Sequence, residues 1–126
     1  MNRTVLMIED NEQNRYLATF LLERRGHSVV SSADGPSGIE EAARLRPDII
    51  LLDIQLPGLD GYAVARALRQ NPALDAIPIV AVTSYAMPGD REKALEAGCT
   101  GYLEKPIDPD TFVDSIERFL PPKESP

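Results

Sequence analysis

Several short apolar runs of this sequence end in side chains that can carry out chemistry. Carboxylates follow the first and third runs, hydroxyls follow the fourth, and a carboxylate and an amine follow the fifth. If the fold brings the ends of these runs together, the side chains form one polar site. The residues concerned are Glu9, Asp10, Asp53, Thr83, Ser84, Glu104 and Lys105.

Three of these side chains, Glu9, Asp10 and Asp53, are carboxylates, which repel one another at close range. Without a counter-charge, at least one of them would hold a proton near neutral pH. Magnesium prefers oxygen ligands, keeps several waters, and is typically held by one or two carboxylates together with a phosphate. We therefore expect Mg²⁺ between Asp10 and Asp53, with Glu9 mainly holding a coordinated water.

The charges at this expected site indicate what it could bind. Three carboxylates, the Lys105 ammonium and one Mg²⁺ sum to about zero. Converting one carboxylate into a phosphoryl ester, which carries about two negative charges, leaves an excess of about one negative charge. The Thr83 hydroxyl, the Ser84 backbone N–H and the Lys105 ammonium can stabilise that excess. This combination indicates phosphoryl transfer to a carboxylate oxygen, with the protein mainly positioning the reacting groups.

The elements that must position these residues are short β-rich runs that alternate with amphipathic segments. Three of the expected strands are continuous Val, Ile and Leu runs, as expected when helices cover both faces of a parallel sheet. The strand at 28–32 is more polar, which suits the edge of a sheet. Strands are expected at 4–8, 28–32, 48–52, 77–82 and 101–103, and helices at 11–26, 37–46, 60–70, 87–97 and from 108 onward.

This alternation predicts an α/β fold, a doubly wound parallel sheet with right-handed crossovers. Five strands favour the order 2-1-3-4-5, in which the ligand crevice lies beyond the carboxyl ends of the strands. The polar residues described above occupy those ends. The pattern therefore predicts that segments far apart in the sequence meet at one site.

Local signals predict where several helices begin or end. Asn11 and Asp60 are good N-caps, and Gly26 is a good helix stop. For Asp34, which precedes a Gly-Pro pair, a turn is the better interpretation. His27 follows the helix stop and is expected to be a solvated turn residue.

The last helix carries its own start signal. Asp108 is an expected N-cap, with Pro109 at the first helical position. Apolar residues at helical spacing follow and predict a packed C-terminal helix. Its expected core positions are Phe112, Val113, Ile116, Phe119 and Leu120.

The composition excludes several classes of function. The 126 residues include 20 acidic and 13 basic side chains, a formal net charge of −7 that disfavours nucleic-acid binding. No apolar stretch is long enough for a secretory signal or a membrane span, which favours the cytoplasm. One cysteine, Cys99, expected to be a small packed side chain, cannot close an intramolecular disulfide or form a zinc cluster. We expect one domain over 1–120 and a tail or linker over 121–126.

Four motifs occur in order along the chain: Glu9, Asp10 and Asn11, then the run 53–61, then the pair Thr83 and Ser84, and finally Lys105 with Pro106. In order and spacing they resemble the receiver domain of bacterial two-component response regulators, over nearly the whole chain. The resemblance implies the flavodoxin-like (βα)5, or CheY-like, version of the predicted fold. The chain looks most like the stand-alone, cell-cycle type of regulator.

The resemblance also implies a role for each site residue. Asp53 would be the phosphoacceptor. Asp10, Asp53 and the backbone carbonyl of Gln55 would hold Mg²⁺, and Lys105 would bind the phosphoryl group. The peptide bond before Pro106 would be cis.

The function implied by the resemblance is a phosphorylation-controlled signalling switch and not an enzyme. A sensor histidine kinase or a phosphotransfer protein would donate the group, and the face formed by the fourth helix, fifth strand and fifth helix would bind a downstream protein. Tyr102 would turn inward as Thr83 moves toward the phosphoryl group; a plain strand tyrosine is the competing interpretation. Mg²⁺-dependent self-phosphorylation from small donors and slow autodephosphorylation are expected, with Gln55 and Tyr85 placed to tune water access.

Two other interpretations of the same residues are open. One is a docking module on the same fold that works without phosphorylation. The other is a phosphatase with an aspartyl-phosphate intermediate. Such phosphatases, of the haloacid-dehalogenase type, usually carry a second Asp two residues after the nucleophile, where this chain has Gln55. The presence of all the residues needed for phosphorylation favours the switch.

Overall fold

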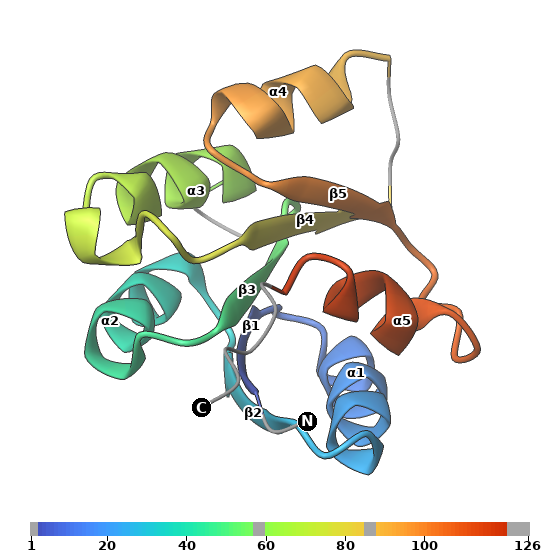
Figure 1. Cartoon of the computed structure of the whole chain (residues 1–126). Helices are drawn as coiled ribbons and strands as arrows, with labels where there is room; N and C mark the ends of the chain where they lie inside the picture. The colour runs from blue at the N-terminus through green and yellow to red at the C-terminus, as the bar shows by residue number, and fades with distance from the viewer. Residues whose placement is uncertain (1–2, 57–59, 85–87, 121–126) are drawn as a thin grey trace.

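Five parallel strands form the centre of the computed structural model, which describes residues 3–56, 60–84 and 88–120. Their order is β2-β1-β3-β4-β5, as predicted, and the polar strand is at an edge. Helices lie on both sides of the sheet (Figure 1). The strands are β1 (Thr4–Ile8), β2 (Ser28–Ser32), β3 (Ile49–Asp53), β4 (Ile79–Thr83) and β5 (Gly101–Glu104).

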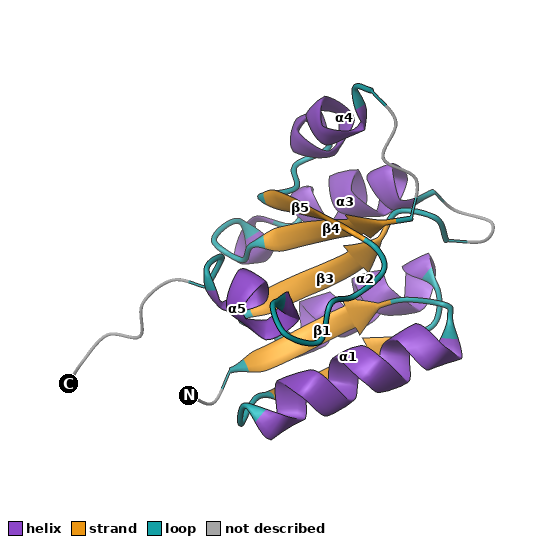
Figure 2. Cartoon of the chain, turned by 90° about the vertical axis from the view of Figure 1, so that its right-hand side faces the viewer, coloured by secondary structure: helices purple, strands orange, loops and turns teal. Residues whose placement is uncertain are grey.

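An α-helix follows each strand along the chain. The helices are α1 (Glu12–Arg24), α2 (Gly35–Leu45), α3 (Gly61–Arg69), α4 (Asp90–Glu96) and α5 (Phe112–Glu117), with a short 3-10 helix, η1, at Pro72–Leu74. Figure 2 shows α1 and α5 on one face of the sheet and α2 and α3 on the other. The helix α4 packs beside β5 and contributes Ala94 to the apolar cluster on the α2 and α3 face. The chain therefore has the doubly wound architecture that its alternating pattern predicts.

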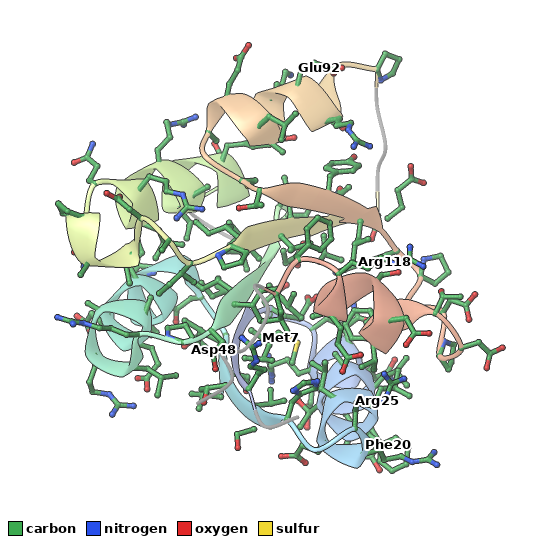
Figure 3. All side chains as sticks on the ribbon, viewed as in Figure 1. Met7, Phe20, Arg25, Asp48, Glu92 and Arg118 are labelled. Atoms are coloured by element: carbon green, nitrogen blue, oxygen red, sulfur yellow. The ribbon has the colours of Figure 1, made fainter. Side chains whose placement is uncertain are left out.

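Two apolar cores lie on the two faces of the sheet. Because successive strand residues point to opposite faces, Leu6 and Ile8 of β1 pack in the cluster under α2 and α3, whereas Val5 and Met7 pack under α1 and α5. Figure 3 shows Met7 in the interior and Glu92 on the outer side of α4. Burial on both faces is the reason that the central strands are continuous apolar runs in the sequence.

Side-chain caps begin three of the α-helices. Asn11 and Asp60 accept hydrogen bonds from backbone N–H groups of α1 and α3, as predicted. Asp34 likewise caps α2, so the turn predicted there is wrong. The reason is that Gly35 and Pro36 form the first turn of the helix, where the missing N–H of proline removes no intrahelical bond.

The C-terminal helix α5 begins later than predicted. The Asp108 side chain accepts the Asp110 N–H at 2.9 Å, and the Asp108 carbonyl accepts the Phe112 N–H at 2.9 Å. Asp108 thus closes a separate turn that includes Pro109, and it does not cap α5, which begins at Phe112. The predicted core positions still pack against the sheet, within the helix or just after it: Phe112, Val113, Ile116, Phe119 and Leu120.

His27 is buried, so the prediction of a solvated turn residue is wrong. Its Nδ1 accepts the Arg3 backbone N–H at 3.3 Å, and its Nε2 lies 2.8 Å from Oε2 of Glu117 on α5. Because Nδ1 accepts, the neutral ring carries its proton on Nε2 and donates it to Glu117. Arg25 also pairs with Glu117, at 2.7 Å. His27 and Arg25 therefore fix α5 against the segment that joins α1 to β2.

Cys99 is buried, as predicted. Burial raises the pKa of its thiol to about 11, against a smaller opposite effect from the charge of Arg69. A thiol with this pKa is protonated near neutral pH and therefore a poor nucleophile.

Some predictions concern residues outside the described ranges. They are the motif residues Pro57, Gly58 and Leu59, the proposed water-access residue Tyr85, the start of the fourth helix at Met87, and the tail 121–126. Within the described ranges, none of the helices combines the length and the apolar character that crossing a bilayer requires.

Candidate functional site

The carboxyl ends of the strands bring the chemistry-bearing residues to one end of the sheet. Asp53 pairs with Val82 in the parallel register of β3 and β4, and both Asp53 and Thr83 end their strands. Glu9 follows β1, and Lys105 follows β5. The Lys105 backbone N–H donates to the Thr83 carbonyl at 2.7 Å, which ties the end of β5 to the end of β4. The predicted convergence of these segments is confirmed.

Glu9, Asp10 and Asp53 form a compact acidic cluster. One carboxylate oxygen of each residue lies within 4.8 Å of the others. Asp53 is 3% exposed and Glu9 is 5% exposed, whereas Asp10 is exposed. Two buried acids and one solvent-facing acid form an all-oxygen donor set that could hold a hard divalent cation.

The Lys105 ammonium is a counter-charge inside this cluster. Its Nζ lies 2.8 Å from Oε1 of Glu9 and 3.5 Å from Oδ2 of Asp53. The side chain is only 9% exposed, so the pairing is shielded from water. The peptide bond between Lys105 and Pro106 is cis, as the resemblance implied.

One positive charge does not fully offset the buried acids. Burial raises the pKa of Glu9 above its ordinary value of 4.5, and the neighbouring Asp53 raises it further. The Lys105 ammonium and the Asn11 N–H, which donates to Oε2 of Glu9 at 3.2 Å, act in the opposite direction without cancelling the effect. A cation at the cluster would favour the ionised form of Glu9.

Gln55 connects the loops that follow β3 and β4. Its backbone N–H donates to Oδ1 of Asp53 at 2.9 Å, and its side-chain Oε1 accepts the Ser84 backbone N–H at 3.1 Å. The sequence predicts that this Ser84 N–H holds a phosphoryl group. In the structure this N–H donates to Gln55 instead. Whether the contact forms depends on the rotamer of Gln55 and on the distance between the loops after β3 and β4.

Thr83 and Tyr102 lie on the neighbouring strands β4 and β5. Thr83 is buried at the end of β4. Tyr102 packs against the cluster under α2 and α3, and its hydroxyl is buried without a hydrogen-bond partner in the described part of the chain. Burial raises the pKa of Tyr102, and the charges of Asp90 and Glu104 raise it further. The side chain therefore lies on the inner side of β5, and its switch role stays a prediction.

Comparison with known protein families shows which family this chain belongs to. The chain matches the response regulator receiver domain family over residues 5–117. It belongs to this family. Response regulator receiver domains are signalling modules of two-component systems, and they typically bind Mg²⁺.

Individual relatives match nearly the whole receiver domain. The polar-differentiation response regulator DivK of Brucella anthropi is 38% identical over 120 residues, which cover 95% of this chain and 98% of that protein. The chemotaxis protein CheY4 of Vibrio cholerae superposes with a TM-score of 0.90 at 28% identity, covering 95% of this chain and all of the other. The similarity to DivK confirms the predicted resemblance to a stand-alone regulator.

One solved relative contains a metal. It is the receiver domain of a sensor histidine kinase from Pseudomonas aeruginosa, solved with a magnesium ion coordinated in its active-site cleft. It is 36% identical to this chain, with a TM-score of 0.85, and covers 94% of this chain and 98% of its own. The metal belongs to that protein; the acidic cluster described above is the group that could hold one here.

Arg15 is a residue at the receiver site that the sequence reasoning missed. Its Nη1 donates to the backbone carbonyl of Glu9 at 2.8 Å. The Arg15 backbone N–H donates to the carbonyl of the N-cap Asn11, so the side chain extends from the first turn of α1 toward the loop after β1. A basic residue four positions after an N-cap that follows an acidic pair is the signal that could have found it. Arg15 positions the Glu9 backbone and adds positive charge beside the acids.

Gly61, the last residue of the 53–61 motif, packs against the backbone of the loop that follows Asp53. Its N–H donates to the Ile54 carbonyl at 3.0 Å. A Cβ at Gly61 would clash with Cα of Ile54 and would lie 2.8 Å from the carbonyl oxygen of Asp53. Because both contacts are with backbone atoms, a side chain fits there only if the loop that carries the Asp53 carboxylate moves.

Replacing Gly61 with Ala should lower the free energy of unfolding by about 2–3 kcal/mol, because the clash cannot be relieved by a side-chain rotation. The displaced loop should also weaken Mg²⁺ binding. Urea denaturation with and without Mg²⁺ measures both effects. Gly89→Ala is the matched control: Gly89 has φ +89° with no heavy atom within 4 Å of a Cβ, so only the backbone penalty of about 1–2 kcal/mol applies. An equal or larger loss for Gly89→Ala would show that the contact of Gly61 with the Asp53 loop is unimportant.

Proposed function

We propose that this receiver domain is a phosphorylation-controlled switch in which Asp53 accepts a phosphoryl group. The observation that carries the proposal is the setting of Asp53, a carboxylate only 3% exposed, at the end of the central strand β3, beside Lys105 and within 4.8 Å of Glu9 and Asp10. Burying a carboxylate among like charges is costly, so an arrangement of this kind points to function and not to stability. Membership of the receiver family supports the same role.

Asp10, Asp53 and the backbone carbonyl of Gln55 would hold Mg²⁺, with Glu9 mainly holding a coordinated water. The oxygen donors of the acidic cluster and the raised pKa of Glu9 fit a hard divalent cation. When bound, Mg²⁺ supplies positive charge to the oxygens of the phosphoryl group that is transferred.

In the proposed transfer, a carboxylate oxygen of Asp53 attacks the phosphorus of a phosphohistidine or of acetyl phosphate. The new O–P bond forms as the bond between phosphorus and the donor breaks, and the donor leaves with that electron pair. The Lys105 ammonium lies 3.5 Å from Oδ2 of Asp53 and would bind an oxygen of the transferred group. The Thr83 hydroxyl and the Ser84 backbone N–H would supply neutral donors.

The donor would be a sensor histidine kinase or a histidine phosphotransfer protein in the cytoplasm. Phosphorylation would shift α4, β5 and α5, and a downstream protein would bind this face. Tyr102 on β5 would follow Thr83 inward. Moving such a switch from mostly off to mostly on requires a preference of about 5.5 kcal/mol for the active state, and a few charge-assisted hydrogen bonds to the phosphoryl group can supply it.

We do not expect Asp53 to turn over phosphate esters catalytically. A phosphatase of the haloacid-dehalogenase type usually has a second Asp two residues after the nucleophile, as the acid and base of the reaction. Here that position is Gln55, whose neutral amide has no titratable proton and already accepts the Ser84 N–H. We propose instead that the group leaves Asp53 by slow hydrolysis.

Incubation with Mg²⁺ and acetyl phosphate tests the proposal. The intact protein should gain the mass of one phosphoryl group, and chelation of Mg²⁺ with EDTA should prevent the gain. Borohydride reduction of the acyl phosphate, followed by proteolytic mapping, should locate the modification at Asp53. If no mass is added, or if it maps elsewhere, the proposal fails. The phosphorylation-independent docking module then takes its place, with the same partner binding before and after treatment.

A further inference from the structure

The backbone N–H of Ser84, the first residue after β4, is bound by a side chain from the neighbouring loop. Ser84 N lies 3.1 Å from Oε1 of Gln55, two residues after the end of β3. Gln55 is itself held in place, because its backbone N–H donates to Oδ1 of Asp53 at 2.9 Å. Gln55 therefore connects the Asp53 carboxylate, through its backbone N–H, to the residue that follows Thr83, through its side chain.

This bond conflicts with the state in which Asp53 carries a phosphoryl group. An amide N–H has one hydrogen and makes one well-aligned hydrogen bond. The Ser84 N–H can therefore donate to Oε1 of Gln55 or to a phosphoryl oxygen on Asp53, but not fully to both. The Gln55 amide oxygen and the phosphoryl oxygen compete for one donor.

We propose that Gln55 is a positioning residue that acts as an internal latch: its Oε1 takes the place of a phosphoryl oxygen on the Ser84 N–H and is displaced when Asp53 is modified. The inference rests on the proposed function. The latch holds the end of β4 near Asp53 before modification, and it weakens retention of the phosphoryl group because one acceptor must be exchanged for another.

The exchange has a direct path to β5. The Thr83 carbonyl, on the residue before Ser84, accepts the Lys105 backbone N–H at 2.7 Å. Movement of Ser84 from Gln55 toward Asp53 therefore displaces the peptide unit that the end of β5 is bonded to. The latch thus couples the acceptor of the Ser84 N–H to the segment that carries Lys105.

Three substitutions of Gln55 separate the acceptor from other properties of the side chain. Gln55→Met keeps a similar length and volume but has no strong acceptor. Gln55→Asn keeps the amide but is one methylene too short to reach Ser84. Gln55→Glu keeps an acceptor at the same reach. The backbone N–H that donates to Asp53 remains in all three, and because Gln55 is only half-buried we expect the fold to tolerate each of them.

The probe is beryllofluoride, formed from beryllium chloride and sodium fluoride, which occupies the position of a phosphoryl group on a carboxylate. Amide exchange of Ser84 is measured by NMR on the whole chain with Mg²⁺, before beryllofluoride is added. The dissociation constant of beryllofluoride is then measured for each protein. Thermal unfolding of each variant shows that the fold is retained.

We expect the Ser84 amide to exchange faster in Gln55→Met and Gln55→Asn than in the wild type. Both variants should bind beryllofluoride about three- to tenfold more tightly, the range that corresponds to one neutral, solvent-accessible hydrogen bond. Gln55→Glu should keep the Ser84 amide protected and should bind beryllofluoride more weakly than the wild type, because its acceptor is charged.

Two results would overturn the latch. One is wild-type affinity for beryllofluoride in Gln55→Met. The other is tighter binding by Gln55→Met with wild-type binding by Gln55→Asn, which would assign the effect to the polarity of the amide and not to its reach. Failure of the proposed function looks different, because then the wild type and all three variants would not bind beryllofluoride at all.

Discussion

Replacing Asp53 with Asn should abolish phosphorylation by acetyl phosphate and, in magnesium-free buffer, stabilise the unmodified fold. Phosphorylation is lost because the amide has no nucleophilic carboxylate oxygen. The fold gains because Asp53 is a buried acid that raises the pKa of Glu9, and the neutral Asn removes this repulsion while Lys105 stays paired with Glu9 at 2.8 Å. We expect a gain of about 1–2 kcal/mol in the free energy of unfolding.

Urea denaturation in EDTA and then in Mg²⁺ measures the change in stability. A ligand that binds only the folded state stabilises it, so Mg²⁺ should stabilise the wild type more than the variant, which has lost one metal-binding charge. Asn keeps an oxygen that can accept the Gln55 N–H, now at 2.9 Å from Oδ1 of Asp53, so the loop is preserved. Asp60→Asn is the matched control, because Asn caps α3 as well as Asp does.

Two outcomes would contradict this prediction. Phosphoryl transfer to Asp53→Asn would show that another residue is the acceptor. Equal stability of the wild type and Asp53→Asn in EDTA would show that repulsion within the acidic cluster does not destabilise the folded protein.

The sequence predicted the secondary structure correctly wherever a single hydrophobic pattern determines it. Continuous apolar runs such as Ile49–Leu52 occur where a strand is covered on both faces, and the polar run Ser28–Ser32 occurs at an edge. The misses are at places where a tertiary contact overrides a local signal. His27 follows a helix-ending glycine, which indicates an exposed turn, but Glu117 from the other end of the chain gives its ring a buried partner. Asp108 has the features of an N-cap, but its bonds close a separate turn before α5.

The same limit applies to the site. Convergence of the strand ends follows from the parallel topology, so Glu9, Asp53 and Lys105 could be placed together from the sequence. The individual hydrogen bonds of the site could not be predicted from the sequence, because they depend on side-chain rotamers and on close backbone contacts between loops. The Gln55 side chain on the Ser84 N–H and the Arg15 guanidinium on the Glu9 carbonyl are both of this kind.

Replacing Lys105 with Met should destabilise the fold and also impair phosphorylation. Met keeps the length of the side chain but leaves the buried Glu9 and Asp53 carboxylates without the ammonium that lies 2.8 Å and 3.5 Å from them. Removing one partner of a buried ion pair costs about 3 kcal/mol or more. Phosphorylation by acetyl phosphate should slow by about a hundredfold or more, the usual effect of deleting one charge-stabilising group from a transfer site.

The pH dependence separates the electrostatic loss in Lys105→Met from simple misfolding. Lys105 lowers the pKa of Glu9, so without it the pKa rises further above 4.5. Between 4.5, the ordinary value expected for the unfolded chain, and this raised pKa, the folded state binds more protons than the unfolded state, so stability increases as the pH falls through that interval. The deficit of the variant relative to the wild type should therefore be smaller at about pH 5 than at about pH 8.

Lys93→Met is the matched control for Lys105→Met, because Lys93 is exposed on α4. Its replacement should change neither the free energy of unfolding nor the rate of phosphorylation measurably. A deficit of Lys105→Met that is independent of pH would assign the loss to packing of the side chain. Phosphorylation of Lys105→Met at the wild-type rate would show that the ammonium serves only to hold Glu9 and Asp53 together in the unmodified protein. We expect a stability deficit that shrinks in acid together with slow phosphorylation at neutral pH. This combination requires that the Lys105 charge both stabilises the buried acids and assists phosphoryl transfer.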